Sequence, residues 1–261
     1  MKLPRLGLLS LLCLLTLPSC DGPQPIAPPE SETPPPTPAP PAQPLLPTET
    51  GTTWTYQVTT RLPLLPEPEG ELPEGQLNPQ DLKAVKTMAV EGISLIGEEK
   101  TPALSISTRN EETRLRNDFW NLSPEGLHYL GSKFFLPTGE ARYVAVDPAI
   151  PYLKTEMEPG MSWEVTSEVG GAQTMRTFDV IAQEEVEVPA GTFEATQIRV
   201  VETRALNQDE PSGSQDSVRR FFWFVPGKGF VRSELEVYQR GNLVKVETEE
   251  LLSLESVSAA E

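Results

Sequence analysis

The chain has few of the side chains on which enzyme and metal sites usually depend. It contains two cysteines, Cys13 and Cys20, and one histidine, His128. Because no cysteine lies beyond residue 20, the rest of the chain has no disulfide, no thiolate nucleophile and no cysteine-based zinc or iron–sulfur site. A single histidine also excludes the paired-histidine zinc sites. Stability must therefore come from an apolar core, which a folded region of about 200 residues is long enough to bury.

Basic residues are scarce as well. The 261 residues include 21 Lys and Arg against 38 Asp and Glu, which gives a formal net charge of −17 at pH 7. Such a surface repels phosphate backbones, and no basic stripe interrupts it. The composition therefore predicts no nucleic-acid binding and disfavours adhesion of the folded region to an anionic lipid surface.

The sequence contains no motif that is characteristic of a particular enzymatic reaction. The sequence lacks a G-x-S-x-G elbow, a Ser-x-x-Lys pair and a glycine-rich phosphate loop after a strand. His128, between Leu127 and Tyr129, is predicted to be an ordinary residue on the face of a sheet. We therefore expect no enzyme, no cofactor and no metal.

Acidic residues leave one alternative open, a carboxylate-dependent hydrolase, which we consider less favoured. On a strand, adjacent carboxylates point to opposite faces and cannot share a substrate. A weak calcium site in a Gly/Ser-rich loop is also disfavoured, because the EF-hand spacing is absent. The adjacent pairs are Glu111-Glu112, Glu184-Glu185 and Glu249-Glu250, and the loop residues are Asp209, Glu210 and Asp216.

The N-terminus has the pattern of an export signal. Lys2 and Arg5 precede an apolar stretch over residues 6–17. That stretch is about a dozen residues long, whereas a transmembrane helix needs roughly 20. The pattern predicts a cleaved signal peptide, not a permanent membrane span.

The residues behind this stretch, Leu17-Pro18-Ser19-Cys20, resemble the lipobox of signal-peptidase-II substrates. This resemblance implies cleavage between Ser19 and Cys20 and attachment of diacylglycerol to the Cys20 sulfur. Two or three acyl chains would anchor the protein stably in a membrane. The expected location is the cell envelope, facing the periplasm or the exterior. Asp21 resembles an inner-membrane retention signal of some diderm bacteria, but the choice of membrane stays open.

Composition then divides the rest of the chain. Twelve of the 28 prolines lie between Asp21 and Thr50, and proline favours extended polyproline II over packed structure. We predict four parts: a signal peptide (1–19), the lipidated cysteine with a disordered proline-rich tether (20–50), an antiparallel β domain (51–252) and a disordered tail (253–261).

Short alternating runs broken by turn residues fill the predicted domain. They predict a mostly β fold, a curved antiparallel meander or an incomplete β-barrel. No convincing amphipathic helix is present, although residues 82–90 could begin as one. The first predicted strand follows Gly51; the others are 82–96, 103–108, 114–122, 127–130, 142–146, 162–169, 175–188, 192–203, 217–225, 230–239 and 243–251.

Three motifs resemble those of a group of bacterial envelope domains without an established activity. They are G-x-x-W-x-Y at Gly51/Trp54/Tyr56, V-P-A-G-T-F at Val188–Phe193, and W-F-x-P-G-x-G-x-V at Trp223–Val231. The resemblance implies a curved antiparallel sheet on a secreted or lipidated protein, and it implies no catalytic residue.

Two classes of function remain favoured. The first is a structural or protein-binding module of the envelope. The second is a carrier whose curved sheet shelters an apolar ligand or lipid. The carrier hypothesis rests on six aromatic residues that could line a groove and could equally be core: Trp54, Trp120, Trp163, Phe222, Trp223 and Phe224.

The lipid anchor makes a direct prediction. A fatty-acid probe should label the wild-type protein, and Cys20→Ala should abolish the label because no other sulfur at the cleavage site can form the thioether. Labelling is read on a gel of membrane fractions. An unlabelled wild type would contradict the anchor.

Overall fold

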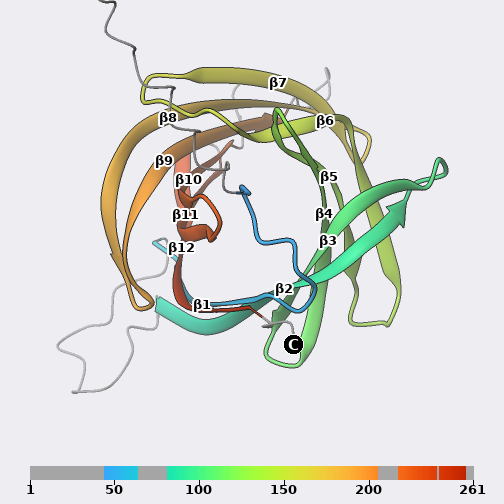
Figure 1. Ribbon diagram of the computed structural model, residues 1–261, viewed down its shortest axis with the longest axis horizontal. Helices are drawn as coiled ribbons and strands as arrows, with labels where there is room; N and C mark the ends of the chain where they lie inside the picture. The colour runs from blue at the N-terminus through green and yellow to red at the C-terminus, as the bar shows by residue number, and fades with distance from the viewer. Residues whose placement is uncertain (1–43, 64–80, 205–216, 240, 257–261) are drawn as a thin grey trace, which may run out of the picture. The chain divides into compact units, whose positions relative to one another are not determined.

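A computed structural model describes residues 44–63, 81–204, 217–239 and 241–256. These residues form twelve antiparallel strands joined in sequence order, and β1 pairs with both β2 and β12, so the sheet closes into a barrel (Figure 1). The strands are β1 (Thr53–Arg61), β2 (Asp81–Ile96), β3 (Thr101–Asn110), β4 (Thr113–Ser123), β5 (Gly126–Phe135), β6 (Ala141–Lys154), β7 (Ser162–Val169), β8 (Ala172–Val188), β9 (Gly191–Arg204), β10 (Ser217–Val225), β11 (Gly229–Gln239) and β12 (Asn242–Glu255).

The predicted antiparallel meander is confirmed, and the structure adds that its two ends meet. No helix occurs among the described residues, so none there is long and apolar enough to cross a membrane. Residues 82–90 do not begin a helix, because β2 pairs along this stretch with β1 on one side and β3 on the other. The signal, the lipidation site and most of the tether lie outside the described residues, as do the loop at 205–216 and residues 257–261 of the predicted tail. Residues 253–255, predicted as part of that tail, instead continue β12.

Strand β6 runs well past its predicted end at residue 146, despite Pro148 and Pro151. Proline cannot donate to a sheet ladder, but β6 pairs with β7 only at Val146 and Asp147. Pro148 lies at an irregularity of the β5–β6 ladder, between Ala145 and Ile150, and Pro151 is paired with β5 alone. The carbonyl of Pro151 instead accepts a hydrogen bond from Trp163 Nε1 at 2.8 Å.

Aromatic side chains fill the middle of the barrel. Tyr152, on β6, makes edge-to-face ring contacts with residues on four other strands, which together span the interior. Its ring centroid lies 5.3 Å from Trp120, 5.6 Å from Phe178, 5.4 Å from Phe222 and 6.3 Å from Phe230. We call this group the aromatic tier. Edge-to-face contacts of this kind add to the burial of ring area.

One end of the barrel is closed by the segment that precedes β1. We call residues 44–52 the plug. Its Leu46 side chain is only 4% exposed, and Gly227, in the β10–β11 turn, donates its N–H to the carbonyl of Pro44 at 2.8 Å. Gly51 donates to the carbonyl of Val90 at 2.8 Å. The ordered domain thus includes residues ahead of Gly51.

The same turn is held by side chains of β1. Trp54 Nε1 donates to the carbonyl of Lys228 at 2.6 Å, and the Tyr56 hydroxyl donates to the carbonyl of Phe230 at 2.7 Å. Between them Gly229 has φ +90°, and a Cβ there would stand 3.1 Å from Leu46 Cδ2. The opening and late motifs of the sequence therefore meet at the plugged end.

Gly229→Ala should destabilise the fold by about 2 kcal/mol, because it combines a left-handed backbone with a crowded Cβ. Gly241→Ala is the matched control: its φ is +79°, but a Cβ there would meet nothing within 4 Å. It should cost about 1 kcal/mol from backbone strain alone. Urea unfolding measures both. Equal losses would contradict the packing of Leu46 on Gly229.

Candidate functional site

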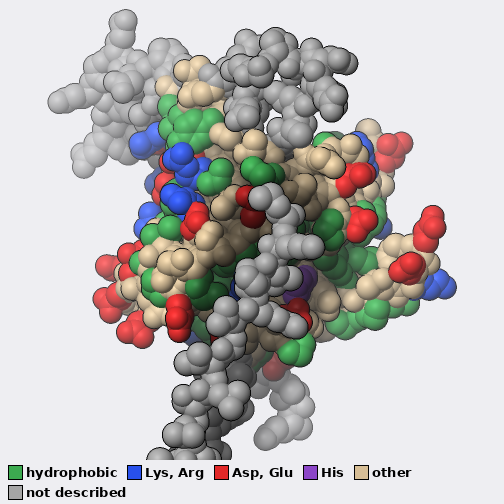
Figure 2. Space-filling view, turned by 90° about the horizontal axis from the view of Figure 1, so that it is seen from above, with side chains coloured by type: hydrophobic (Ala, Val, Ile, Leu, Met, Phe, Trp, Pro, Cys, Tyr) green, Lys and Arg blue, Asp and Glu red, His purple; other side chains and the backbone are tan. Residues whose placement is uncertain are grey.

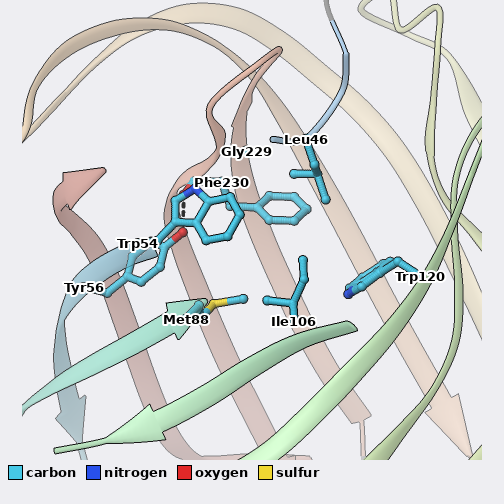
Figure 3. Close-up of a pocket in the computed structure, with 8 residues that line it drawn as sticks. All are labelled: Leu46, Trp54, Tyr56, Met88, Ile106, Trp120, Gly229 and Phe230. Carbon is cyan, nitrogen blue, oxygen red and sulfur yellow. Dashed lines mark hydrogen bonds between the residues drawn. The ribbon is translucent and has the colours of Figure 1, made fainter. Parts of the chain in front are cut away.

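A pocket lies inside the barrel just beneath the plug (Figure 3). It is lined by Leu46, Trp54, Tyr56, Met88, Ile106, Trp120, Gly229 and Phe230. The pocket is small: the centre of a water-sized sphere can move through about 20 Å³ of it. In Figure 3, Met88 and Ile106 point into the space between Trp54 and Trp120. Apart from the backbone and the polar tips of three aromatic rings, the lining is apolar.

The structure separates the six aromatic residues singled out from the sequence. Trp54 and Trp120 line the pocket. Phe222 and Phe224 face the interior and pack on Phe230, at centroid distances of 4.8 and 5.7 Å.

Trp163 and Trp223 lie elsewhere. The Trp163 ring stacks on Phe178 at 5.1 Å. Trp223 lies on the other face of β10, because side chains alternate along a strand. There its Nε1 donates to Glu184 Oε1 at 2.7 Å, and the Arg232 guanidinium lies 4.8 Å from its ring. Two of the six thus line the pocket.

Beyond the aromatic tier, away from the plug, charged side chains occupy the interior. Lys86, on β2, pairs with Glu249, on β12, across the intervening β1. Ser233 Oγ donates to Glu249 Oε2 at 3.2 Å. Burial alone would raise the pKa of Glu249, but the positive charges of Lys86 and Arg220 and the bond from Ser233 outweigh it and hold that pKa below its ordinary value.

A second pair continues around the wall. Arg116 Nε donates to Asp118 Oδ2 at 3.0 Å, and Ser132 Oγ donates to the other oxygen of Asp118. The Tyr129 hydroxyl shares a short hydrogen bond with Ser132. Burial, reinforced by the charge of Asp118, raises the pKa of Tyr129 to about 12, so this hydroxyl keeps its proton at neutral pH.

A third pair lies on the opposite wall. Arg176 binds Glu202 through Nε at 3.0 Å and Nη2 at 2.8 Å, and its Nη1 donates to Ser167 at 3.1 Å. Arg220, on the same face of β10 as Phe222, lies near Tyr152. Burial raises the pKa of that tyrosine, and Arg220 partly offsets the rise.

Lys245 and Glu247, on the same face of β12 as Glu249, form a fourth pair at 2.6 Å. We call these residues the charged tier. Among the described side chains it has five cations (Lys86, Arg116, Arg176, Arg220, Lys245) and four carboxylates (Asp118, Glu202, Glu247, Glu249). Within the described residues, no group of three or more His, Cys, Asp or Glu is arranged to hold a metal ion. The side chain of Asp118 is 6% exposed, whereas that of Arg116 is 40% exposed although it faces inward. Solvent therefore reaches the interior at this level.

The charged tier was not predicted from the sequence, although the spacing of charged residues along the strands indicates it. Lys86 has the same strand parity as Met88 and Val90, and Arg116 and Asp118 have that of Trp120. A charge on the apolar face of a strand indicates a polar interior. The predicted opposite orientation of Glu249 and Glu250 agrees with this pattern, since Glu249 faces inward and strand alternation turns Glu250 outward.

Comparisons with known proteins find weak structural similarity only. No protein-family model and no curated protein sequence matches the chain. One similar structure is a "putative exported protein with YmcC-like fold" from Bacteroides fragilis NCTC 9343, with 13% identity, a TM-score of 0.44, and coverage of 82% of this chain and 100% of that one. Another is a "putative lipoprotein" from Parabacteroides distasonis ATCC 8503, with 13% identity, a TM-score of 0.41, and coverage of 82% and 99%. Similarity at this level does not extend to function.

Glu249→Gln should destabilise the barrel by about 2 kcal/mol at pH 7, because it leaves the Lys86 charge inside without its anion. The folded-state pKa of Glu249 is depressed, so its contribution is fully present above the unfolded value of about 4.3 and is lost as the pH falls through the folded value. The stability difference between the two proteins should therefore shrink below about pH 4.

Denaturant unfolding between pH 3 and pH 8 measures this difference. Glu236→Gln is the matched control, because it removes a carboxylate whose partner, Arg219, lies 3.2 Å away and is 47% exposed, against 15% for Lys86. It should cost less than about 1 kcal/mol. Equal losses of unfolding free energy for the two substitutions would contradict the claim that burial makes the unpaired Lys86 charge costly.

Proposed function

We propose that the protein is a lipid-anchored, extracytoplasmic binding protein whose barrel holds a small apolar group beneath the plug. The proposed binding role is supported by one observation, the pocket between Trp54, Trp120 and Phe230, which Leu46 covers on one side. Concave sites with mostly apolar walls and a few polar groups are typical of small-molecule binding. The anchor and the envelope location are inferred from the N-terminal signal and Cys20.

We propose a binding role without catalysis. Each described carboxylate of the charged tier is paired with a cation: Asp118 with Arg116, Glu202 with Arg176, Glu247 with Lys245, and Glu249 with Lys86. A glycosidase-like acid needs a raised pKa, whereas the pKa of Glu249 is lowered. The hydrolase alternative thus gains no proton donor from Glu249.

A second candidate, contact with another envelope protein, is favoured by the β2–β3 hairpin. This hairpin projects from the barrel in both Figure 1 and Figure 2. Its Ile93 and Leu95 are 71% and 65% exposed, and β2 has no pairing with β1 beyond Ala89. Exposed apolar side chains beside an unpaired strand edge favour association with another chain.

The pocket predicts binding of a short aliphatic chain. Octanol should change the fluorescence of Trp54 and Trp120, measured in a folded Trp163→Phe, Trp223→Phe background that removes the two tryptophans outside the pocket. Leu46→Ala should tighten binding roughly tenfold, because it makes room for one or two more methylene groups at about 0.8 kcal/mol each.

Ile93→Ala is the control, since this exposed residue lies on the hairpin, and it should leave the affinity unchanged. If octanol alters the fluorescence of neither the parent protein nor the Leu46→Ala variant, the pocket does not bind apolar chains.

A further inference from the structure

The apolar pocket and the charged tier share residues of the barrel wall. Tyr56 lines the pocket, and the ammonium group of Lys86 lies 5.0 Å from the centre of the Tyr56 ring. A molecule that fills the pocket and extends away from the plug therefore meets charged side chains within the length of one ring.

The same transition occurs on the facing wall. Trp120 lines the pocket and lies 4.9 Å from the Tyr129 ring. Hydrogen bonds link the Tyr129 hydroxyl through Ser132 to Asp118, and Asp118 accepts a hydrogen bond from Arg116. Both walls thus change from apolar to polar at the same depth in the barrel.

The sign of the charge at this depth is opposite to that of the chain. The whole protein has a formal net charge of −17, whereas the described side chains of the charged tier include one more cation than carboxylates. Inside a low-dielectric wall such an excess acts more strongly than it would in water. The Arg116 side chain is 40% exposed, against 15% for Lys86 and 9% for Arg176.

Arginine recognises carboxylate and phosphate oxygens through a planar set of donors. Each described carboxylate of the charged tier already has a cation partner, and so do Lys86 and Arg116, whereas Arg220 has no ion pair among the described side chains. We propose that the ligand is a single-chain amphiphile with an anionic head group, whose chain fills the pocket and whose head lies against Arg116, Lys86 and Arg220. This inference rests on the proposed function.

The test compares four eight-carbon probes at pH 7: octanoate, octyl phosphate, octanol and octylammonium. Binding is followed by tryptophan fluorescence in the same double-phenylalanine background. At least one anionic probe should bind tenfold or more tightly than octanol, and octylammonium should bind more weakly than octanol. The preference for the anion should decline with added salt. Whichever of octanoate and octyl phosphate binds more tightly identifies the head group as a carboxylate or a phosphate ester.

Arg116→Gln should reduce the affinity for the preferred anion to that for octanol and leave octanol binding unchanged. Unchanged octanol binding also shows that the variant is folded. If Arg116→Gln does not fold, the double variant Arg116→Gln, Asp118→Asn removes the pair together and should show the same selective loss. The control is Arg219→Gln on the outer face, which should change neither affinity.

Equal affinities for the anions and octanol would overturn this inference while the proposed function stands. So would an Arg116→Gln variant that keeps the preference for the anion. Failure of all four probes to bind would instead overturn the proposed function itself.

Discussion

Closure of the sheet through β1 sets the size of the barrel interior, and the packing inside follows from that size. Because β1 pairs with both β2 and β12, all twelve strands form one wall and the barrel diameter is fixed. An eight-stranded barrel is just wide enough for its own side chains to fill. A barrel of twelve strands encloses more space, so its interior needs long side chains, inserted chain or solvent.

The protein uses all three. Aromatic rings centred on Tyr152 span the middle, the plug inserts Leu46 at one end, and long charged side chains line the rest, where solvent reaches Arg116. Charges withdrawn from water are costly unless they are paired and hydrogen-bonded, which accounts for the ion pairs of Lys86, Arg116 and Arg176. The same requirement places a polar environment directly beside an apolar one, and that juxtaposition is what makes the interior suited to an amphiphilic ligand.

The sequence predicted the fold better than the site. Alternation and turn glycines located each strand, since the period of two and the tight turns are local properties. The end of β6 was missed, because prolines are tolerated there only where β7 does not pair with it. The plug was missed because Pro44 and Leu46 belong to a stretch whose composition indicates a tether. The charged tier was missed because a polar residue on a strand suggests a wet outer face; its position inside follows from closure, which is a long-range property. Alternation places Trp223 and Phe222 on opposite faces of β10, but only the structure shows that the face of Phe222 is the interior.

Binding of an amphiphile in the barrel is tested most directly by native mass spectrometry of the full acylated protein purified from its own host. We expect a mass greater than that of the lipidated chain, with the difference released on denaturation as a single-chain anionic amphiphile. A protein that is detected only at the mass of the lipidated chain, and that binds no added octanoate or octyl phosphate, would show that the interior holds no such ligand.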